Sequence, residues 1–257
     1  MSLKNLHFVD EALRLVRRSE EQGLRLRILG SVAYRLHSPA NLHLFSEMDR
    51  ELTDIDFGAY REQSHAIRKF MIAEGYKPNE RLFVGTEGAR HAYQHPEWSL
   101  HVDVFTDELN YCHAIPFKGR LELDSPTITT TDLLLEKMQI VQINLKDLKD
   151  SMVLLLEHPV ADPEAGRENI DADYICSIMA RDWGFYYTFT MNLSKVIEFM
   201  PQFPAIGSDQ ADVIRGRIAR LLHRVEVEPK SMKWKLRAKI GTRTRWYQEV
   251  SEKGDIF

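Results

Sequence analysis

Cysteine is scarce in this chain, which has 2 cysteines, Cys112 and Cys176, among 257 residues. Two cysteines so far apart cannot build a cysteine-rich zinc site, and they give no basis for a disulfide framework. Long apolar runs are also missing, because the longest, Met152 to Leu156, is far too short to span a bilayer. Residues 1–20 mix charged and apolar positions, unlike a signal peptide. These absences predict a cytoplasmic, reduced protein with no membrane partner.

Charge of one sign does not dominate either, since the formal net charge is -4 and the isoelectric point is near 6.2. The chain as a whole therefore has no attraction for nucleic acid, and any such attraction must come from a local patch. Hydrophobic residues make up 44% and charged residues 28%, which is typical of folded globular proteins. The length allows one large domain or two modest ones.

The spacing of apolar residues divides the chain into a mixed part and a mainly helical part. In the first part we expect a helix ending near Gly23, strands within 24–29, 52–60 and 98–105, and helices over 62–74 and 132–156. The polar segment 161–169 is the expected linker, and helices are expected over 174–180, 186–200 and 209–225. This order predicts an α+β fold, with a mixed β-sheet flanked by helices in residues 1–158 and a mainly helical region in 159–257.

Three acidic residues carry the first chemical hypothesis. Asp54 and Asp56 lie two apart in a strand-like run, so their side chains leave the same face. Asp103 lies on another expected strand, on the face opposite Val102 and Val104. If the strands are neighbours, the three carboxylates converge, and their repulsion favours a pair of Mg²⁺ ions, with Mn²⁺ as a substitute. We therefore predict that these three acids are catalytic and bind metal.

A glycine-serine turn lies between the first expected strand and a short helix. Gly30 and Ser31 would present backbone N–H groups and a hydroxyl to an anion, with help from the helix dipole. Arg35 is four residues past Ser31 and so lies on the same helix face. Either motif alone is more often an ordinary turn or a solvated strand end, so the prediction depends on their order along the chain.

The motifs together resemble a known family. LRILGSVAYR followed by TDIDF is similar to the signature of the DNA polymerase β-type nucleotidyltransferase superfamily, and HVDVF resembles its third-acid strand. With EKMQIVQINLKDLKD added, the set is most similar to the nucleotidyltransferases of abortive-infection (AbiEii-like) toxin systems, over residues 24–151. The resemblance implies a metal-dependent enzyme, of toxin type, that moves a nucleoside monophosphate from an NTP to a hydroxyl or phosphate acceptor and releases pyrophosphate.

The resemblance also assigns roles. It implies a nucleotide-binding set made of Gly30, Ser31, Arg35, Lys137, Asp147 and Asp150. It makes Asp103 either a metal ligand or the base toward the attacking hydroxyl. From the residues alone, Lys137 fits a solvated helix position equally well, and Asp147 and Asp150 fit surface charges at i, i+3.

One spacing departs from the family pattern. Between Ser31 and Asp54 there are 22 residues (32 through 53), more than the family usually has. We interpret residues 40–50 as an inserted loop or helix near the nucleotide pocket. This insert bears on which bases or substrates fit the pocket.

The segment Lys230 to Arg245 is basic, with seven lysines or arginines and no acid. Trp234 lies within it and Trp246 directly follows it. Such a mixture suits an RNA or protein acceptor, or the triphosphate of the donor, but it also fits a solvated helix face. The rival functions are a non-catalytic nucleotide-binding module, a toxin–antitoxin interaction module and a partner-dependent subunit.

Overall fold

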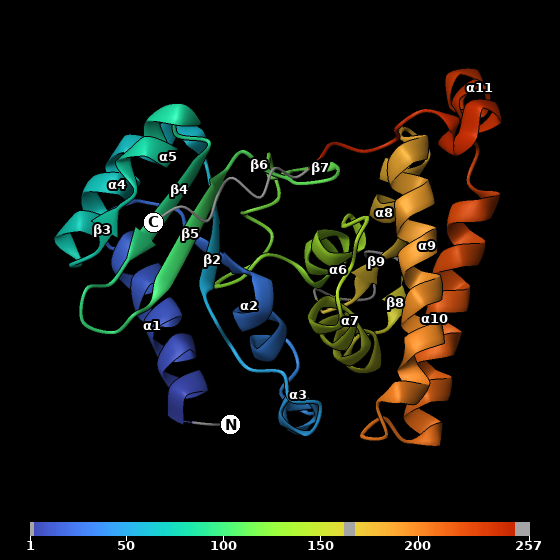
Figure 1. Cartoon of the computed structure of the whole chain (residues 1–257), viewed down its shortest axis with the longest axis horizontal. Coiled ribbons are helices and arrows are strands. Elements are labelled where there is room, and N and C mark those ends of the chain that lie inside the picture. The colour runs from blue at the N-terminus through green and yellow to red at the C-terminus, as the bar shows by residue number, and fades with distance from the viewer. Residues whose placement is uncertain (1–2, 162–167, 250–257) are drawn as a thin grey trace.

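The computed structural model describes residues 3–161 and 168–249 of the chain. The molecule is mixed α/β, 54% helical and 13% strand, with a sheet in its first half and a helical C-terminal part (Figure 1). The expected linker 161–169 falls mostly outside the described residues. No helix within the described ranges has both the length and the apolar character needed to cross a membrane.

The main sheet has five strands: β1 (Arg27–Leu29), β2 (Ile55–Ala59), β3 (Lys77–Pro78), β4 (Arg90–Gln94) and β5 (His101–Thr106). Their order across the sheet is β1-β2-β5-β4-β3. β2 and β5 are parallel, whereas the other neighbouring strands are antiparallel. The expected mixed sheet is thus confirmed, and the strands around Asp56 and Asp103 are neighbours.

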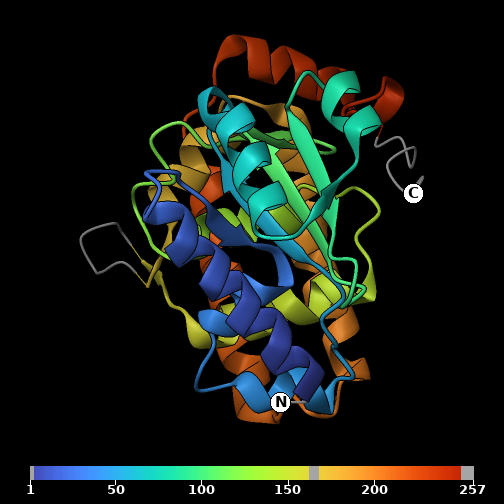
Figure 2. The ribbon, with the colours of Figure 1, turned by 90° about the vertical axis from the view of Figure 1, so that its left-hand side faces the viewer.

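Helices cover both faces of this sheet. The first part of the chain forms α1 (Leu3–Glu20), α2 (Gly30–Leu36), α3 (Leu42–Glu47), η1 (Arg61–Gln63), α4 (Ser64–Ala73) and α5 (Glu80–Gly85). Figure 2 shows α1 and α4 in front of the sheet, and Figure 1 shows α2 on its other side. Ile55, Phe57 and Ala59 are fully buried. Because strand side chains alternate, Asp56 lies on the opposite face, the face toward α2.

Two helices and a hairpin connect the sheet to the C-terminal part. They are β6 (Glu108–Asn110), β7 (Ala114–Pro116), α6 (Thr130–Met138) and α7 (Leu145–Glu157). The Thr129 hydroxyl accepts from the Asp132 N–H at 3.2 Å and so caps α6. Asn144 caps α7 in the same way, accepting from the Asp147 N–H at 3.0 Å.

The C-terminal part is helical apart from one short strand pair, β8 (Val160–Ala161) with β9 (Ile170–Asp171). Its helices are α8 (Ala172–Met179), α9 (Trp183–Phe199), η3 (Met200–Gln202), α10 (Ser208–Val227), α11 (Met232–Ile240) and η4 (Gly241–Arg243). They lie beyond α6 and α7, on the side away from the sheet (Figure 1).

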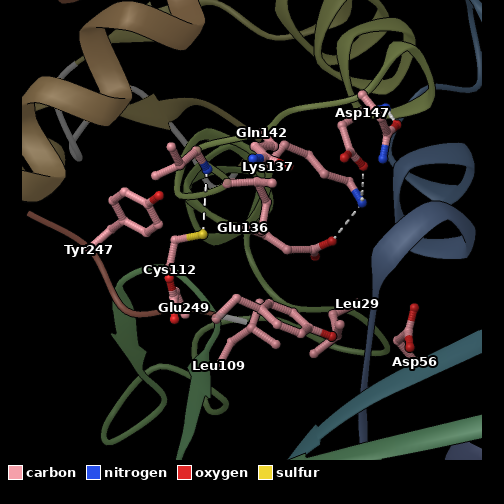
Figure 3. Close-up of a pocket in the computed structure, with 14 residues that line it drawn as sticks. Leu29, Asp56, Leu109, Cys112, Glu136, Lys137, Gln142, Asp147, Tyr247 and Glu249 are labelled. Carbon is pink, nitrogen blue, oxygen red and sulfur yellow. Dashed lines mark hydrogen bonds and ion pairs between the residues drawn. The ribbon is translucent and has the colours of Figure 1, made fainter. Parts of the chain in front are cut away.

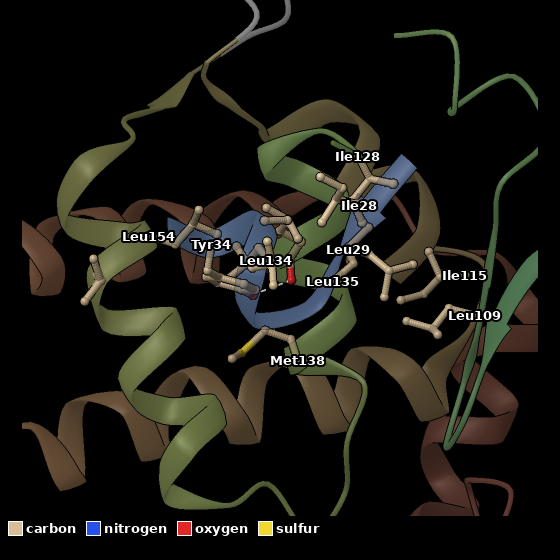
Figure 4. Packing of buried hydrophobic residues seen from close by; sticks show 14 of the residues in the cluster. Ile28, Leu29, Tyr34, Leu109, Ile115, Ile128, Leu134, Leu135, Met138 and Leu154 are labelled. Atoms are coloured by element: carbon tan, nitrogen blue, oxygen red, sulfur yellow. Dashed lines mark hydrogen bonds between the residues drawn. The ribbon is translucent and has the colours of Figure 1, made fainter. Parts of the chain in front are cut away.

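One cluster of buried apolar side chains runs through both parts, from Phe8 in α1 to Val225 in α10. At its centre, Tyr34 of α2 packs among leucines of α6 and α7, and its hydroxyl donates to the carbonyl of Leu133 (Figure 4). The sheet and the C-terminal helices therefore share a core through α2, α6 and α7. A domain boundary at residue 158 stays a prediction.

Candidate active site

Register brings the three predicted acids together. In the sheet Asp56 of β2 pairs with Leu29 of β1 on one side and with Asp103 of β5 on the other. Asp54 directly precedes β2. Asp56 and Asp103 are register partners on parallel strands, so their side chains leave the same face of the sheet. The predicted convergence of carboxylates is present in the structure.

The Asp56 side chain packs directly against the glycine-serine turn. Gly30 has a φ of 67°, in the left-handed region that favours glycine. A Cβ atom at Gly30 would overlap the Asp56 carboxylate. Glycine is therefore required here twice, once for the backbone conformation and once for the approach of the acid.

The acids lie close enough to repel one another. Burial and the neighbouring charges of Asp54, Asp103 and Glu136 raise the pKa of Asp56 well above its ordinary value, and Lys137 opposes the shift. A carboxylate in this position is stabilised when positive charge approaches it. The site therefore favours cations.

Two cations of the chain already lie among these acids. Arg90 of β4 donates to Asp103 with an Nε to Oδ1 distance of 3.0 Å. Lys137 of α6 lies 2.9 Å from Glu136 and 3.2 Å from Asp147. Burial alone would lower the pKa of Lys137, but the surrounding carboxylates raise it well above its ordinary value. Lys137 is thus a buried, charged residue and not the solvated helix residue of the alternative interpretation.

Glu136 also reaches the turn. Its carboxylate accepts a hydrogen bond from the backbone N–H of Gly30 at 2.9 Å. An anionic group therefore sits where the sequence predicts that a phosphate binds. A phosphate could take this position only if the Glu136 side chain moved.

Two members of the predicted nucleotide-binding set point elsewhere. Arg35 is buried, lies over the ring of Phe45 and donates to the carbonyls of Ser31 and Arg50. Asp150 is fully buried and accepts two hydrogen bonds from Arg50, at 2.9 and 2.8 Å. The structure therefore places both residues in the packing between α2 and α7.

The segment 40–50 explains this difference. It forms α3, which packs on α7, and it supplies the arginine that neutralises Asp150. None of its residues lines the cavity described next, although the sequence analysis places this insert near the nucleotide pocket.

A cavity of about 670 Å³, here called the acidic cavity, opens beside Asp56. Its polar wall holds Asp56, Glu136, Lys137 and Asp147, with Lys137 between the two carboxylates that it pairs with (Figure 3). The remaining wall is apolar and aromatic and includes Leu29, Leu109, Tyr111, Ile140, Val141 and Tyr247. Neither Asp54 nor Asp103 lines it. The cavity thus combines a charged end with a wall suited to a flat aromatic group.

A second cavity, of about 590 Å³, is lined in part by Trp246, Tyr247 and Gln248 and is here called the basic cavity. The two cavities share Cys112 and Tyr247. The basic cavity is lined by four cationic side chains, Arg181, Lys233, Arg237 and Arg245, against one acid, Asp182. The predicted basic segment therefore contributes to a concave site as well as to an exposed helix.

The tryptophans of this segment have internal partners. The indole N–H of Trp234 donates to the carbonyl of Met179 at 2.9 Å, and that of Trp246 donates to Thr188 at 3.1 Å. Lys230 donates to the carbonyls of Val225 and Glu226 at the end of α10. These contacts hold the segment against α8–α10, and both tryptophan rings are half-buried and line the basic cavity.

Sequence reasoning missed several residues at this site. Glu136 adjoins Lys137 in the sequence, but one more helix acid carries no signal of its own. Arg90 reaches Asp103 only through strand pairing, and Tyr111 and Tyr247 come from the hairpin and the chain end. Only the fold brings such residues together.

Comparisons with known proteins add no relative to this picture. The chain matches no protein-family model, and searches of curated proteins and of solved structures likewise find no match.

Proposed function

We propose that this chain is a metal-dependent nucleotidyltransferase of the DNA polymerase β type, with the corresponding fold in its sheet-containing part. The observation that carries the proposal is the contact of Asp56 with the Gly30 turn, beside Asp54 and Asp103. Carboxylates that converge beside a glycine-serine turn are what metal-assisted phosphoryl chemistry requires. The resemblance over residues 24–151 supports the same conclusion.

The donor set fits hard divalent cations. Asp54, Asp56 and Asp103 offer only carboxylate oxygens, the ligands that Mg²⁺ prefers. Burial and the repulsion by neighbouring acids raise the pKa of Asp56, and bound cations would oppose both effects. These residues would hold two Mg²⁺ ions, or Mn²⁺ in their place. Bound there, the ions supply charge stabilisation for the triphosphate and the departing pyrophosphate.

The chain's own residues bind and orient the nucleotide. Lys137 binds the phosphates, with Asp147 holding its ammonium group in place. The N–H of Gly30 donates to a phosphate oxygen once Glu136 has turned away. Tyr111 and Tyr247 line the wall against which the base lies.

The reaction transfers one nucleotidyl group. An oxygen of the acceptor forms a bond to the α-phosphorus of the NTP, and the bond from that phosphorus to the bridging oxygen breaks, releasing pyrophosphate. Asp103 serves either as a metal ligand or, in place of that role, as the base that takes the proton of an attacking hydroxyl. The Arg90 guanidinium, 3.0 Å from Asp103, stabilises the ionised form that can accept this proton.

The basic cavity favours RNA as the acceptor. Its four cations suit the phosphates of a polyanion, and it adjoins the acidic cavity through Cys112 and Tyr247. A toxin-type role acting on RNA follows from this and from the resemblance. Labelling of protein or of small molecules instead would redirect the proposal to those acceptors.

The test is transfer of label from NTPs that carry ³²P at the α-phosphate. The purified chain is incubated with each NTP, Mg²⁺, total RNA and lysate protein, and the label is located after separation. We expect label on RNA, and Asp56→Asn should reduce it by more than about a hundredfold. The exposed Asp212→Asn on α10 is the matched control. Transfer at full rate by the Asp56→Asn variant would remove the proposed site.

One observation favours a second function, a non-catalytic nucleotide-binding or toxin–antitoxin interaction module. The acids and Lys137 already satisfy one another without ligand, through Arg90, Glu136 and Asp147. A module of this kind would bind NTP and Mg²⁺ but release no pyrophosphate with any acceptor.

A further inference from the structure

A second cluster of donor groups lies at the other end of α2. His37 follows α2 as its C-cap residue, His158 follows α7 in the same position, and Glu168 lies two residues before β9. One ligand atom from each of the three lies within 4.8 Å of the others. A cavity of about 370 Å³ is lined by all three residues, so the cluster can be reached from outside.

Both ring nitrogens of His158 face carbonyl oxygens, so a positive charge on or beside the ring would be stabilised. Its Nδ1 lies 2.7 Å from the carbonyl oxygen of Glu168, and its Nε2 lies 2.6 Å from the carbonyl oxygen of His37. Carbonyl oxygens only accept hydrogen bonds, and a neutral imidazole carries one N–H. In either neutral tautomer, one nitrogen lone pair therefore faces an oxygen lone pair. Either a second proton or a metal ion resolves this conflict.

A second proton is the less favourable solution. His158 is buried, so a second proton would place a positive charge inside the protein, where charge is costly. The charged groups that face the cluster are the carboxylates of Glu168 and of Asp124, which lies 3.7 Å from His37 Nε2. A metal ion can share these negative charges while leaving both imidazoles neutral.

The orientation of His37 fits a metal ligand. Its Nε2 faces the Ile128 carbonyl at 3.1 Å and the Thr127 hydroxyl at 2.7 Å, and its Nδ1 lies 3.0 Å from the Glu168 carboxylate. Histidines that bind metals commonly donate their far N–H to a carbonyl in this way, which directs the near lone pair to the ion.

We propose that His37, His158 and Glu168 form a zinc site that joins the end of α2 to the end of α7. Glu168 Oε2 lies 3.0 Å from Nδ1 of His37 and 3.7 Å from Nδ1 of His158. Donors about 2.0–2.1 Å from a tetrahedral zinc ion are about 3.3 Å apart, and the Glu168 carbonyl, 2.7 Å from Nδ1 of His158, must turn aside to admit the ion. Imidazole nitrogen suits zinc, whereas the carboxylates around Asp56 suit magnesium.

The site would fix α2 at both ends. The N-terminal end of α2 carries the Gly30 turn against Asp56, and its C-terminal end would be attached through the ion to α7, which carries Asp147. Water from the cavity can complete the coordination. This inference does not rest on the proposed nucleotidyl transfer.

The test uses the full chain carrying Asp56→Asn, stripped with a chelator and kept in millimolar Mg²⁺, so that zinc binding elsewhere is suppressed. Calorimetric titration with Zn²⁺ should give one equivalent bound, with a rise in melting temperature. Co²⁺ in place of Zn²⁺ should give the visible absorption bands of a tetrahedral site. Neither readout depends on catalytic activity.

Two variants and a control decide the result. Glu168→Gln changes an exposed side chain, and it should weaken zinc binding at least about tenfold. His158→Gln should weaken it further, whereas the exposed His43→Gln should leave it unchanged. Absence of stoichiometric zinc binding in the parent protein, or unchanged binding in both cluster variants, would overturn the proposal.

Discussion

The acidic cavity and the basic cavity adjoin at Cys112 and Tyr247 and are built in different ways. The acids that converge on Asp56 come from neighbouring strands and a buried helix, so sheet register and packing fix their positions. The cations of the basic cavity come mostly from the exposed α11 and the residues after it, held by a few tryptophan and lysine contacts. The comparison teaches that changing a charge in the acidic cavity should reduce stability strongly, because the charged groups are buried and paired. Changing a charge in the basic cavity should affect stability little, because its cations are mostly exposed.

The largest effect is expected from the cation inside the acidic cavity. Lys137→Met leaves the Glu136 and Asp147 carboxylates, 7% and 14% exposed, without their shared partner. We expect the free energy of unfolding to fall by about 3 kcal/mol, measured by urea denaturation. The exposed Lys69→Met on α4 is the control. A loss as small as that of the control would show that the acidic cavity tolerates its charges as easily as the basic one.

The next effect concerns the turn beside Asp56. Gly30→Ala adds a methyl group that overlaps the Asp56 carboxylate, and it also places alanine at a positive φ. Gly119→Ala has a similar φ, 71°, but its new Cβ meets nothing within 4 Å, so it isolates the backbone strain. We expect a cost of about 1 kcal/mol for Gly119→Ala and about 2 kcal/mol or more for Gly30→Ala. If thermal unfolding shows the same loss of stability for both variants, the Asp56 side chain moves away from the new methyl group without cost.

A smaller effect is expected in the basic cavity. Arg181→Glu combined with Lys233→Glu reverses two of its charges without touching the acidic cavity. We expect binding of a single-stranded RNA oligonucleotide, followed by fluorescence anisotropy, to weaken at least about tenfold with little change in stability. Lys69→Glu, a charge reversal on the far side of the sheet, is the control. Equal weakening by the control would show that overall charge, and not this cavity, governs RNA binding.

The smallest expected effect is an increase in stability, from the variant Asp56→Asn. The pKa of Asp56 is raised in the folded protein. Protonated Asp56 therefore contributes fully to stability at pH values below its ordinary pKa of 3.8, and this contribution is lost as the pH rises through the raised pKa. Asp56→Asn removes this repulsion, so without divalent cations it should stabilise the protein by about 1 kcal/mol at neutral pH. The gain should vanish near about pH 4, where Asp56 is protonated in the parent protein.

Melting temperatures in the presence of a chelator, across that pH range, measure the difference. Asp212→Asn, which removes an exposed acid, should show no such trend. A variant that is less stable than the parent at neutral pH would contradict the account of mutual repulsion in the acidic cavity.

The sequence predicts the cluster of acids around Asp56 better than it predicts the partners of Arg35 and Asp150. Alternation along a strand predicts that Asp54 and Asp56 share a face. Because β2 and β5 are neighbours, Asp103 then lies beside Asp56. Helical spacing correctly places Arg35 near Ser31, but it does not say which face of α2 meets the core. The buried partner of Asp150 is Arg50, 100 residues away, so nothing local in the sequence reports it.

The basic segment shows the same limit in another form. Its composition predicts charge and aromatic rings in one place, and both are there. Whether a tryptophan is a platform or an anchor depends on a partner elsewhere in the chain, here the Met179 carbonyl for Trp234 and Thr188 for Trp246. Composition carries no information on such partners.

The shared core of the two parts has a consequence for how ligands enter. Domains that close around a ligand rotate about an interface with few packed side chains. Here the interface contains Tyr34, buried among leucines of α6 and α7, so a rigid-body hinge would have to break the core itself. Under the proposed function, nucleotide would therefore enter through rearrangement of single side chains such as Glu136. Crystals of the ligand-free protein should accordingly survive soaking with nucleotide without losing their lattice.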